Sequence, residues 1–204
     1  MNCKNIIVFI SGEGTNMLSL IQATKKVGYP AKIIGVISDN PNARGISKAQ
    51  KENIPTYLIP HNNCSSKEEH GGKIITQLAT LKPDLICLAG YMRILSKEFI
   101  RLYKDKIINI HPSLLPLFPG LNTHRRALQC GVKITGCTVH MVTEKIDDGP
   151  IIAQAAVPVL PNETEESLSQ KVLSVEHLLY PLALEKIILG KVPKNESIHH
   201  IIGM

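Results

Sequence analysis

A chain of 204 residues, 44% of them hydrophobic and 20% charged, has enough apolar content to bury the core of a globular domain, which excludes an intrinsically disordered protein. The formal net charge is +6, but the basic residues are dispersed and no basic helix is interleaved with aromatic side chains, so we expect no nucleic-acid partner. The charge indicates first a solvated basic surface and, as an alternative, a field that favours small anionic ligands. The first apolar run, 6–10, is far shorter than the roughly 20 residues of a membrane-spanning helix and lacks a signal-peptide cleavage site, so we expect a cytoplasmic protein with no membrane partner.

Apolar runs of strand length alternate with amphipathic segments of helical period through the first 111 residues. The expected strands are 6–10, 32–38, 55–59, 84–89 and 106–111. The expected helices are 17–27, 45–52, 67–81 and 97–102. This alternation predicts an α/β fold with three layers, Rossmann-like, in which helices cover both faces of a mostly parallel sheet. Ligands of such sheets lie beyond the carboxyl ends of the strands.

The pattern changes after Pro112, where a proline-rich loop runs to Gly120 and a helix is expected over 124–130. Two strand-like runs follow, 135–142 and 151–159, and we expect them to add antiparallel strands to the sheet. A long helix is expected to begin after Thr164 as its N-cap and to end at Gly190, shortly before Pro193.

The segment from Ser11 to Asn16, between the first strand and the first helix, contains two glycines. Free N–H groups at a helix start bind anions, so this loop is a candidate phosphate site, although a bare turn remains an alternative. It is neither a Walker A loop nor a complete Gly-x-Gly-x-x-Gly motif. Glu13 would repel a phosphate unless its carboxylate points away. Asp39, after the second strand, is the acid that a dinucleotide ribose would need, but the third glycine is missing.

Asn109 and His111 end the fifth strand, and alternation along a strand places their side chains on one face. Acyl transfer needs such donors, aimed at an oxygen that becomes negative in a tetrahedral intermediate, although a histidine at the end of a strand is by itself more often structural. Asp147 lies in an acidic turn before Gly149-Pro150, which by itself indicates only a hairpin turn. If Asp147 reaches His111, it favours the protonated imidazole, which is the better partner for an oxyanion.

Five cysteines, an odd number with no Cys-x-x-Cys pair, indicate neither a disulfide framework nor a zinc knuckle. His61, Cys64 and His70 follow no standard zinc-ligand spacing, and no fourth ligand is evident. We therefore expect no metal.

Seven short motifs follow one another along the chain. They are Ser11-Gly12-x-Gly14-Thr15-Asn16, Ala89-Gly90-Tyr91-Met92-Arg93-Ile94-Leu95, Asn109-Ile110-His111-Pro112-Ser113-Leu114-Leu115-Pro116, Phe118-Pro119-Gly120-Leu121-x-Thr123-His124, Thr138-Val139-His140, Asp147-x-Gly149-Pro150 and Glu176-His177-x-x-Tyr180-Pro181. With them the chain resembles the glycinamide ribonucleotide formyltransferases from about Ile6 to about Pro193. The resemblance implies a single formyltransferase domain over 1–204, with a nucleotide-binding half at about 1–105 and a folate-binding, catalytic half at about 106–204.

The resemblance also implies substrates and site residues. The substrates are glycinamide ribonucleotide and, as co-substrate, 10-formyltetrahydrofolate. The residues implied for the ribonucleotide are Gly14, Thr15, Asn16, Leu173 and Glu176. The residues implied for the folate are Lys67, Met92, Arg93, Ile94, Leu95, Asn109, Thr143, Glu144, Lys145, Ile146 and Asp147. The implied catalytic residues are Asn109, His111 and Asp147, with Thr138 supporting them by ordering water, and the Leu115–Pro116 bond is expected to be cis.

The implied reaction is direct attack of the substrate amine on the formyl carbon, with no covalent enzyme intermediate and no metal. Glu13, Lys67 and Leu117 depart from the residues that are common in the family, where a neutral residue, an arginine and a basic residue are more usual. These departures concern affinity rather than the type of reaction, since none of them is in the catalytic set. The expected assembly is a monomer or a homodimer.

Three alternatives remain. Formyltetrahydrofolate deformylase, a hydrolase, shares the Asn-His-Asp set, but this chain begins directly at its first strand with no regulatory domain ahead of it. A methionyl-tRNA formyltransferase would need a further C-terminal domain to bind tRNA. A nucleotide-binding module without catalysis would have no need for Asn109, His111 and Asp147 together.

Overall fold

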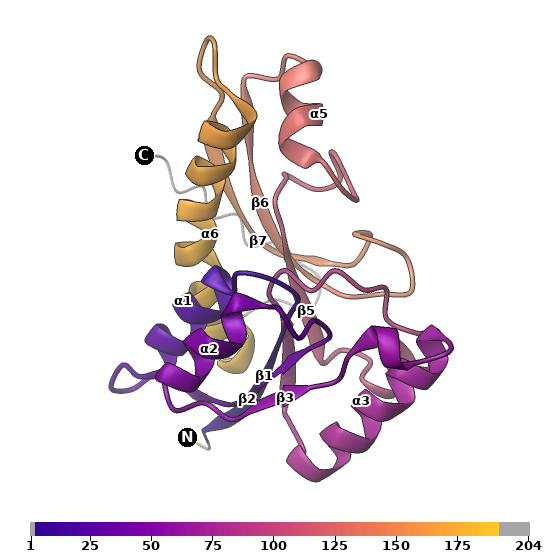
Figure 1. The fold of residues 1–204 in the computed structure, drawn as a ribbon. Helices are drawn as coiled ribbons and strands as arrows, with labels where there is room; N and C mark the ends of the chain where they lie inside the picture. The colour runs from indigo at the N-terminus through magenta and orange to yellow at the C-terminus, as the bar shows by residue number, and fades with distance from the viewer. Residues whose placement is uncertain (1–2, 192–204) are drawn as a thin grey trace. The chain divides into compact units, whose positions relative to one another are not determined.

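The computed structural model describes residues 3–191 and shows an α/β arrangement (Figure 1). Within those residues the sheet has seven strands in the order β3-β2-β1-β4-β5-β6-β7. The strands are β1 (Lys4–Ile10), β2 (Ala31–Ser38), β3 (Thr56–Leu58), β4 (Leu85–Leu88), β5 (Ile107–His111), β6 (Ile134–Met141) and β7 (Ile151–Pro158). The helices are α1 (Thr15–Thr24), α2 (Arg44–Lys51), α3 (Lys67–Leu81), α4 (Lys97–Leu102), α5 (Thr123–Gln129) and α6 (Glu165–Ile188), with a short 3-10 turn, η1 (His61–Asn63).

The chain forms two compact units, Met1–Ile108 and Asn109–Met204, so that the boundary falls inside β5. In the first unit β1 pairs in parallel with both β2 and β4, and β2 pairs in parallel with β3. The apolar run from Ile6 to Ile10 is fully buried, as a strand covered on both faces requires. Helices α1 and α2 lie on one side of these strands and α3 on the other (Figure 1), so the expected helical layers on both faces are confirmed.

In the second unit β6 and β7 form an antiparallel pair with Ile134 opposite Pro158 and His140 opposite Ile151. Helix α6 packs on both strands (Figure 1). It buries a stripe of apolar side chains at helical spacing, namely Leu168, Val172, Val175, Leu179 and Leu184. The antiparallel additions that the sequence indicated are therefore confirmed.

The end of one helix differs from the sequence prediction, while both ends of α6 agree with it. Helix α1 ends at Thr24 rather than near Val27, and Val27 is fully exposed, because the chain turns at Gly28, whose φ is 86°. Thr164 caps α6 as predicted, with its side chain accepting from the Ser167 N–H in a capping box. Gly190 follows the end of α6 with a φ of 65°, as expected, whereas Pro193 lies outside the described residues.

None of the helices between residues 3 and 191 has the length and apolar content that crossing a bilayer requires. In the same part of the chain no group of three or more His, Cys, Asp or Glu side chains is arranged to hold a metal ion.

Candidate active site

The glycine loop of the first unit surrounds a small cavity. Gly14 precedes α1 with a φ of 69°, and a Cβ atom there would lie 2.8 Å from the Cα of Gly45, so glycine is required both by backbone conformation and by space. The cavity has a volume of about 260 Å³. It is lined by Ser11, Gly12, Glu13, Gly14, Thr15, Asn16, Ala89, Gly90 and Met92. The start of α1 thus opens on a space that could hold a small anion.

Glu13 is paired with cations. Its carboxylate lies 3.3 Å from the Arg44 guanidinium and 3.2 Å from the Lys48 ammonium. Lys48 also donates a hydrogen bond to the Glu13 carbonyl oxygen, at 2.8 Å. The two basic side chains offset the negative charge that the sequence placed beside the candidate phosphate site.

Asp39 is buried and joins the glycine loop to the segment around Arg93. One carboxylate oxygen accepts from the Ser11 hydroxyl at 2.5 Å, and the other accepts from Arg93 Nε at 2.7 Å. The same Ser11 hydroxyl accepts from the Met92 N–H at 2.8 Å. Both oxygens of Asp39 are therefore engaged by this chain's own side chains, which accounts for its burial without a dinucleotide ribose.

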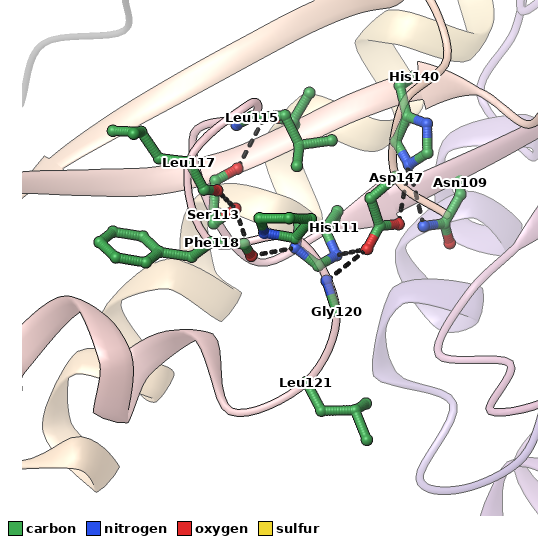
Figure 2. A network of polar contacts seen from close by, with 12 residues as sticks. Asn109, His111, Ser113, Leu115, Leu117, Phe118, Gly120, Leu121, His140 and Asp147 are labelled. Atoms are coloured by element: carbon green, nitrogen blue, oxygen red, sulfur yellow. Dashed lines mark hydrogen bonds and ion pairs between the residues drawn. The ribbon is translucent and has the colours of Figure 1, made fainter. Parts of the chain in front are cut away.

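His111, at the end of β5 in the second unit, faces an acceptor at each ring nitrogen (Figure 2). Nδ1 lies 3.3 Å from a carboxylate oxygen of Asp147, and Nε2 lies 2.9 Å from the Phe118 carbonyl oxygen. A carbonyl oxygen cannot donate, so Nε2 donates to the Phe118 carbonyl. The ring thus lies between a carbonyl and a carboxylate, with only 7% of its side chain exposed.

Asp147 lies in the loop between β6 and β7 with a φ of 51°. The carboxylate oxygen that faces His111 also accepts from the Gly120 N–H at 2.8 Å, and the other oxygen lies 3.6 Å from His140 Nε2 (Figure 2). One carboxylate oxygen of Asp147 therefore faces both the His111 ring and a backbone donor. The structure thus brings Asp147 to His111 from 36 residues away along the chain.

Asn109 is oriented by His140. The Asn109 amide nitrogen lies 3.2 Å from His140 Nε2, and the other ring nitrogen of His140 lies 2.9 Å from the Met141 carbonyl oxygen. Nδ1 therefore donates to the carbonyl and Nε2 accepts from the amide. Burial lowers the pKa of His140, which favours this neutral ring. One N–H of the amide binds His140, and the other remains for a ligand.

His140 belongs to a motif of the sequence, but no role was predicted for it. Alternation along β6 places it on the same face as Thr138, and that pattern could have directed attention to it. The Thr138 hydroxyl is fully buried and binds three groups of the protein: it donates to the Ser113 carbonyl oxygen at 2.7 Å and accepts from Leu115 N–H and from Gln154. It thus anchors the turn that contains the Leu115–Pro116 bond, which is cis as expected.

The remaining predicted ligand residues occupy several elements. Glu176 is buried and Leu173 half-buried on α6, while Met92 and Ile94 in the first unit and Ile146 in the second are exposed apolar side chains. Lys67 is exposed at the start of α3, 3.9 Å from Glu68. Within residues 3–191 the structure shows no hydrogen bond or ion pair that joins Lys67 to the segment 92–95.

Comparison with known proteins identifies similar chains. A family model described as formyl transferase matches residues 4–184. The chain is 38% identical to the phosphoribosylglycinamide formyltransferase of Escherichia coli over 193 residues, which cover 95% of this chain and 91% of that protein. It is 43% identical to the human trifunctional purine biosynthetic protein adenosine-3 over 192 residues, 94% of this chain and 19% of that protein. This chain spans only 14% to 20% of the trifunctional relatives from fly and chicken as well.

A crystal structure with a similar fold is that of phosphoribosylglycinamide formyltransferase from Brucella melitensis. Its sequence is 54% identical to this chain, the TM-score is 0.88, and the match covers 92% of this chain and 96% of that one.

Proposed function

Because this chain belongs to the formyl transferase family, we propose that it transfers the formyl group of 10-formyltetrahydrofolate to the amine of glycinamide ribonucleotide, a step of purine synthesis. The similarity to the Escherichia coli enzyme supports this substrate pair, since it extends over nearly the whole of both chains. The observation that carries the chemistry is the position of His111 between the Asp147 carboxylate and the Phe118 carbonyl, next to Asn109 on the same strand. The hydrolase alternative, formyltetrahydrofolate deformylase, gains no support from the relatives.

Substrate binding follows the two units. The glycine loop would hold the phosphate of the ribonucleotide through Gly14, Thr15 and Asn16, with Leu173 and Glu176 at the ribose. Folate would contact the segments 92–95 and 143–147, whose exposed apolar side chains suit a pterin ring, with Lys67 contributing charge. The boundary at Ile108 supports a nucleotide-binding half of about 1–105 and a catalytic half of about 106–204.

The reaction is attack of the substrate amine on the formyl carbon. As the carbonyl oxygen becomes negative, the free N–H of Asn109 donates to it and the positive charge of His111 stabilises it. Asp147 keeps His111 protonated and, through a water molecule, helps to move a proton from the attacking amine to the folate nitrogen that leaves. Thr138 keeps the 113–116 turn in place. This scheme needs neither a covalent enzyme intermediate nor a metal ion.

The proposed function is tested by an absorbance assay for the folate product, with and without glycinamide ribonucleotide. Product that forms only when both substrates are present supports the transferase. Product without the ribonucleotide would instead identify a hydrolase. No product in either mixture would overturn the proposed substrate pair and direct the search to tRNA substrates or to a binding role.

A further inference from the structure

The segment Leu117–Leu121, here the 117–121 loop, provides backbone groups to the candidate catalytic pair. Its Phe118 carbonyl accepts from His111 and its Gly120 N–H donates to Asp147 (Figure 2). These contacts depend on where the backbone lies rather than on the side chains of the loop. Whatever holds the loop therefore determines the geometry of both His111 and Asp147.

The loop has an unfavourable backbone conformation. Phe118 has a φ of 53° and Gly120 a φ of 78°, and Asn122, which follows the loop, has a φ of 56°. The left-handed region is disfavoured for a residue with a Cβ, so Phe118 and Asn122 need compensating contacts to remain there. Leu117 N–H donates to the Leu114 carbonyl oxygen at 3.0 Å at the start of the loop, and side chains provide further contacts.

Arg126 supplies three of those contacts from helix α5. Its guanidinium donates to the carbonyl oxygens of Pro119 and Leu121, and its Cζ lies 5.5 Å from the centre of the Phe118 ring. Ser113 holds the other end of the loop by donating to the Leu117 carbonyl oxygen at 2.6 Å. An arginine suits this position because its planar group carries several donors in one plane and can also cover an aromatic ring.

We propose that Arg126 is a positioning residue for formyl transfer: by clamping the 117–121 loop, it holds the Phe118 carbonyl against His111 and the Gly120 N–H against Asp147. Arg126 itself touches neither of the two side chains in this scheme and acts only through the loop. The inference rests on the proposed function in so far as His111 and Asp147 carry the chemistry.

Arg125 provides a matched control. It is the adjacent arginine of α5, and its guanidinium forms an exposed ion pair with Glu165 at 3.0 Å, directed to α6 and not to the loop. An exposed pair of this kind contributes little to stability. Replacing Arg125 removes the same charge from the same short helix but leaves the loop contacts intact.

The first test measures kcat and KM for both substrates in Arg126→Ala, Arg126→Lys and Arg125→Ala. A displacement of about 1 Å at reacting groups can lower turnover by about 100-fold, so we expect kcat of Arg126→Ala to fall by about 10- to 100-fold with both KM values nearly unchanged. Lysine can bind a carbonyl but cannot cover the ring, so Arg126→Lys should recover part of the loss. Arg125→Ala should keep the wild-type kcat.

The second test needs no substrate and follows the His111 ring by nitrogen-15 NMR. In the wild type the Nε2 proton bonded to Phe118 should exchange slowly with water, and in Arg126→Ala its signal should be lost. If the wild type does not formylate glycinamide ribonucleotide, the proposed function fails, while this NMR comparison still decides on the clamp. A kcat in Arg126→Ala equal to or above that of the wild type, or an equal loss in Arg125→Ala, overturns the proposal, as does an unchanged His111 signal. Should Arg126→Ala fail to fold, Arg126→Lys decides by the same readings.

Discussion

At the scale of single residues, the candidate site depends on which atoms donate and which accept. His111 faces two acceptors, the Phe118 carbonyl and the Asp147 carboxylate. His140 faces the Met141 carbonyl, the Asn109 amide and, at 3.6 Å, the other oxygen of Asp147, so the two histidines of the site have different partners. Burial lowers the pKa of His140 and so favours its neutral form. The His140 ring then orients the Asn109 amide.

Removing the side chain of either Asn109 or His111 should reduce kcat strongly. Loss of one oxyanion donor usually lowers kcat by about 100- to 1,000-fold, and we expect Asn109→Ala and His111→Ala each to reach or exceed that range. The measurement is steady-state kcat, with thermal unfolding to verify that the variants remain folded. Near-normal turnover in a folded variant would contradict the roles assigned to these residues.

His140 should act on Asn109 through its acceptor nitrogen. In His140→Phe the amide loses its partner and can rotate, so we expect kcat to fall by about 5- to 10-fold, which corresponds to one hydrogen bond of about 1 kcal/mol. In His140→Gln the side-chain oxygen can take over the acceptor position, and kcat should fall less. The test is the comparison of kcat between the two variants. Equal values would show that kcat does not depend on an acceptor for the Asn109 amide at position 140.

At the scale of elements, the β6–β7 hairpin delivers Asp147 to the site. Its loop closes on Gly149, where a Cβ atom would lie 1.8 Å from the Met141 carbonyl oxygen, an impossible approach. The sequence indicated only an acidic hairpin turn here, since the pairing of Gly149 with the backbone of β6 is a contact in space. Glycine at this position therefore lets the loop fold against the end of β6.

Gly149→Ala should disturb both stability and activity. Overpacking of this kind typically costs about 1 to 3 kcal/mol, and relief by movement of the loop would displace Asp147. We expect a lower free energy of unfolding in urea together with a lower kcat. Gly72→Ala is the control, because Gly72 lies in α3 with no atom near its Cβ position, and it should leave kcat unchanged and stability equal or higher by up to about 1 kcal/mol. If Gly149→Ala proved as stable and as active as the wild type, this account would be wrong.

Element boundaries were predictable where local signals agreed. Helix α3 spans Lys67–Leu81 and α4 spans Lys97–Leu102, both as predicted, because Ser66 and Ser96 cap them and Pro83 ends the first. Helix α1 ended early because the apolar side chain of Val27 matched the helical period although it lies in a turn. Periodicity alone cannot distinguish a last helical turn from an apolar residue that follows it.

At the scale of the whole molecule, three histidines of the second unit influence stability at mildly acidic pH. Burial is the main cause that lowers the pKa of His124, His140 and His177 from 6.5. The unfolded chain therefore takes up protons first as the pH falls below about 6.5, and the folded state loses stability there. Carboxylates act at lower pH: hydrogen bonding to Lys171 lowers the pKa of Glu163 from 4.5 to about 2, so its contribution disappears only below about pH 4.5.

His177→Leu should reveal this effect. Among residues 3–191 the buried Nε2 of His177 finds no hydrogen-bond partner, so its protonation is penalised in the folded chain only. We expect the variant to gain more stability relative to the wild type at pH 5.5 than at pH 7.5, measured by urea unfolding at both pH values. The same change in stability at both pH values would contradict the assigned cause.

The fold class and the shared face of Asn109 and His111 were predictable because they follow from the alternation of elements and from alternation along a strand, whereas the place of Asp147 was indicated only by the family resemblance. The loop carbonyl of Phe118, the N–H of Gly120 and the clamp by Arg126 were not, because a backbone group carries no residue signature. Glu13 presented a repulsive charge in the sequence, and only the placement of Arg44 and Lys48 beside it resolved the difficulty.

The acceptor for His111 is a main-chain oxygen, and every amino acid possesses one. Evolution can therefore replace the side chain at position 118 without removing this acceptor, provided that the new residue tolerates a φ near 53° and that Arg126 still holds the carbonyl oxygens of Pro119 and Leu121. The spacing of the loop is not free in the same way. A single inserted or deleted residue between Pro116 and Asn122 would present a different carbonyl to the imidazole, so drift in this segment should proceed by substitution while its length stays constant.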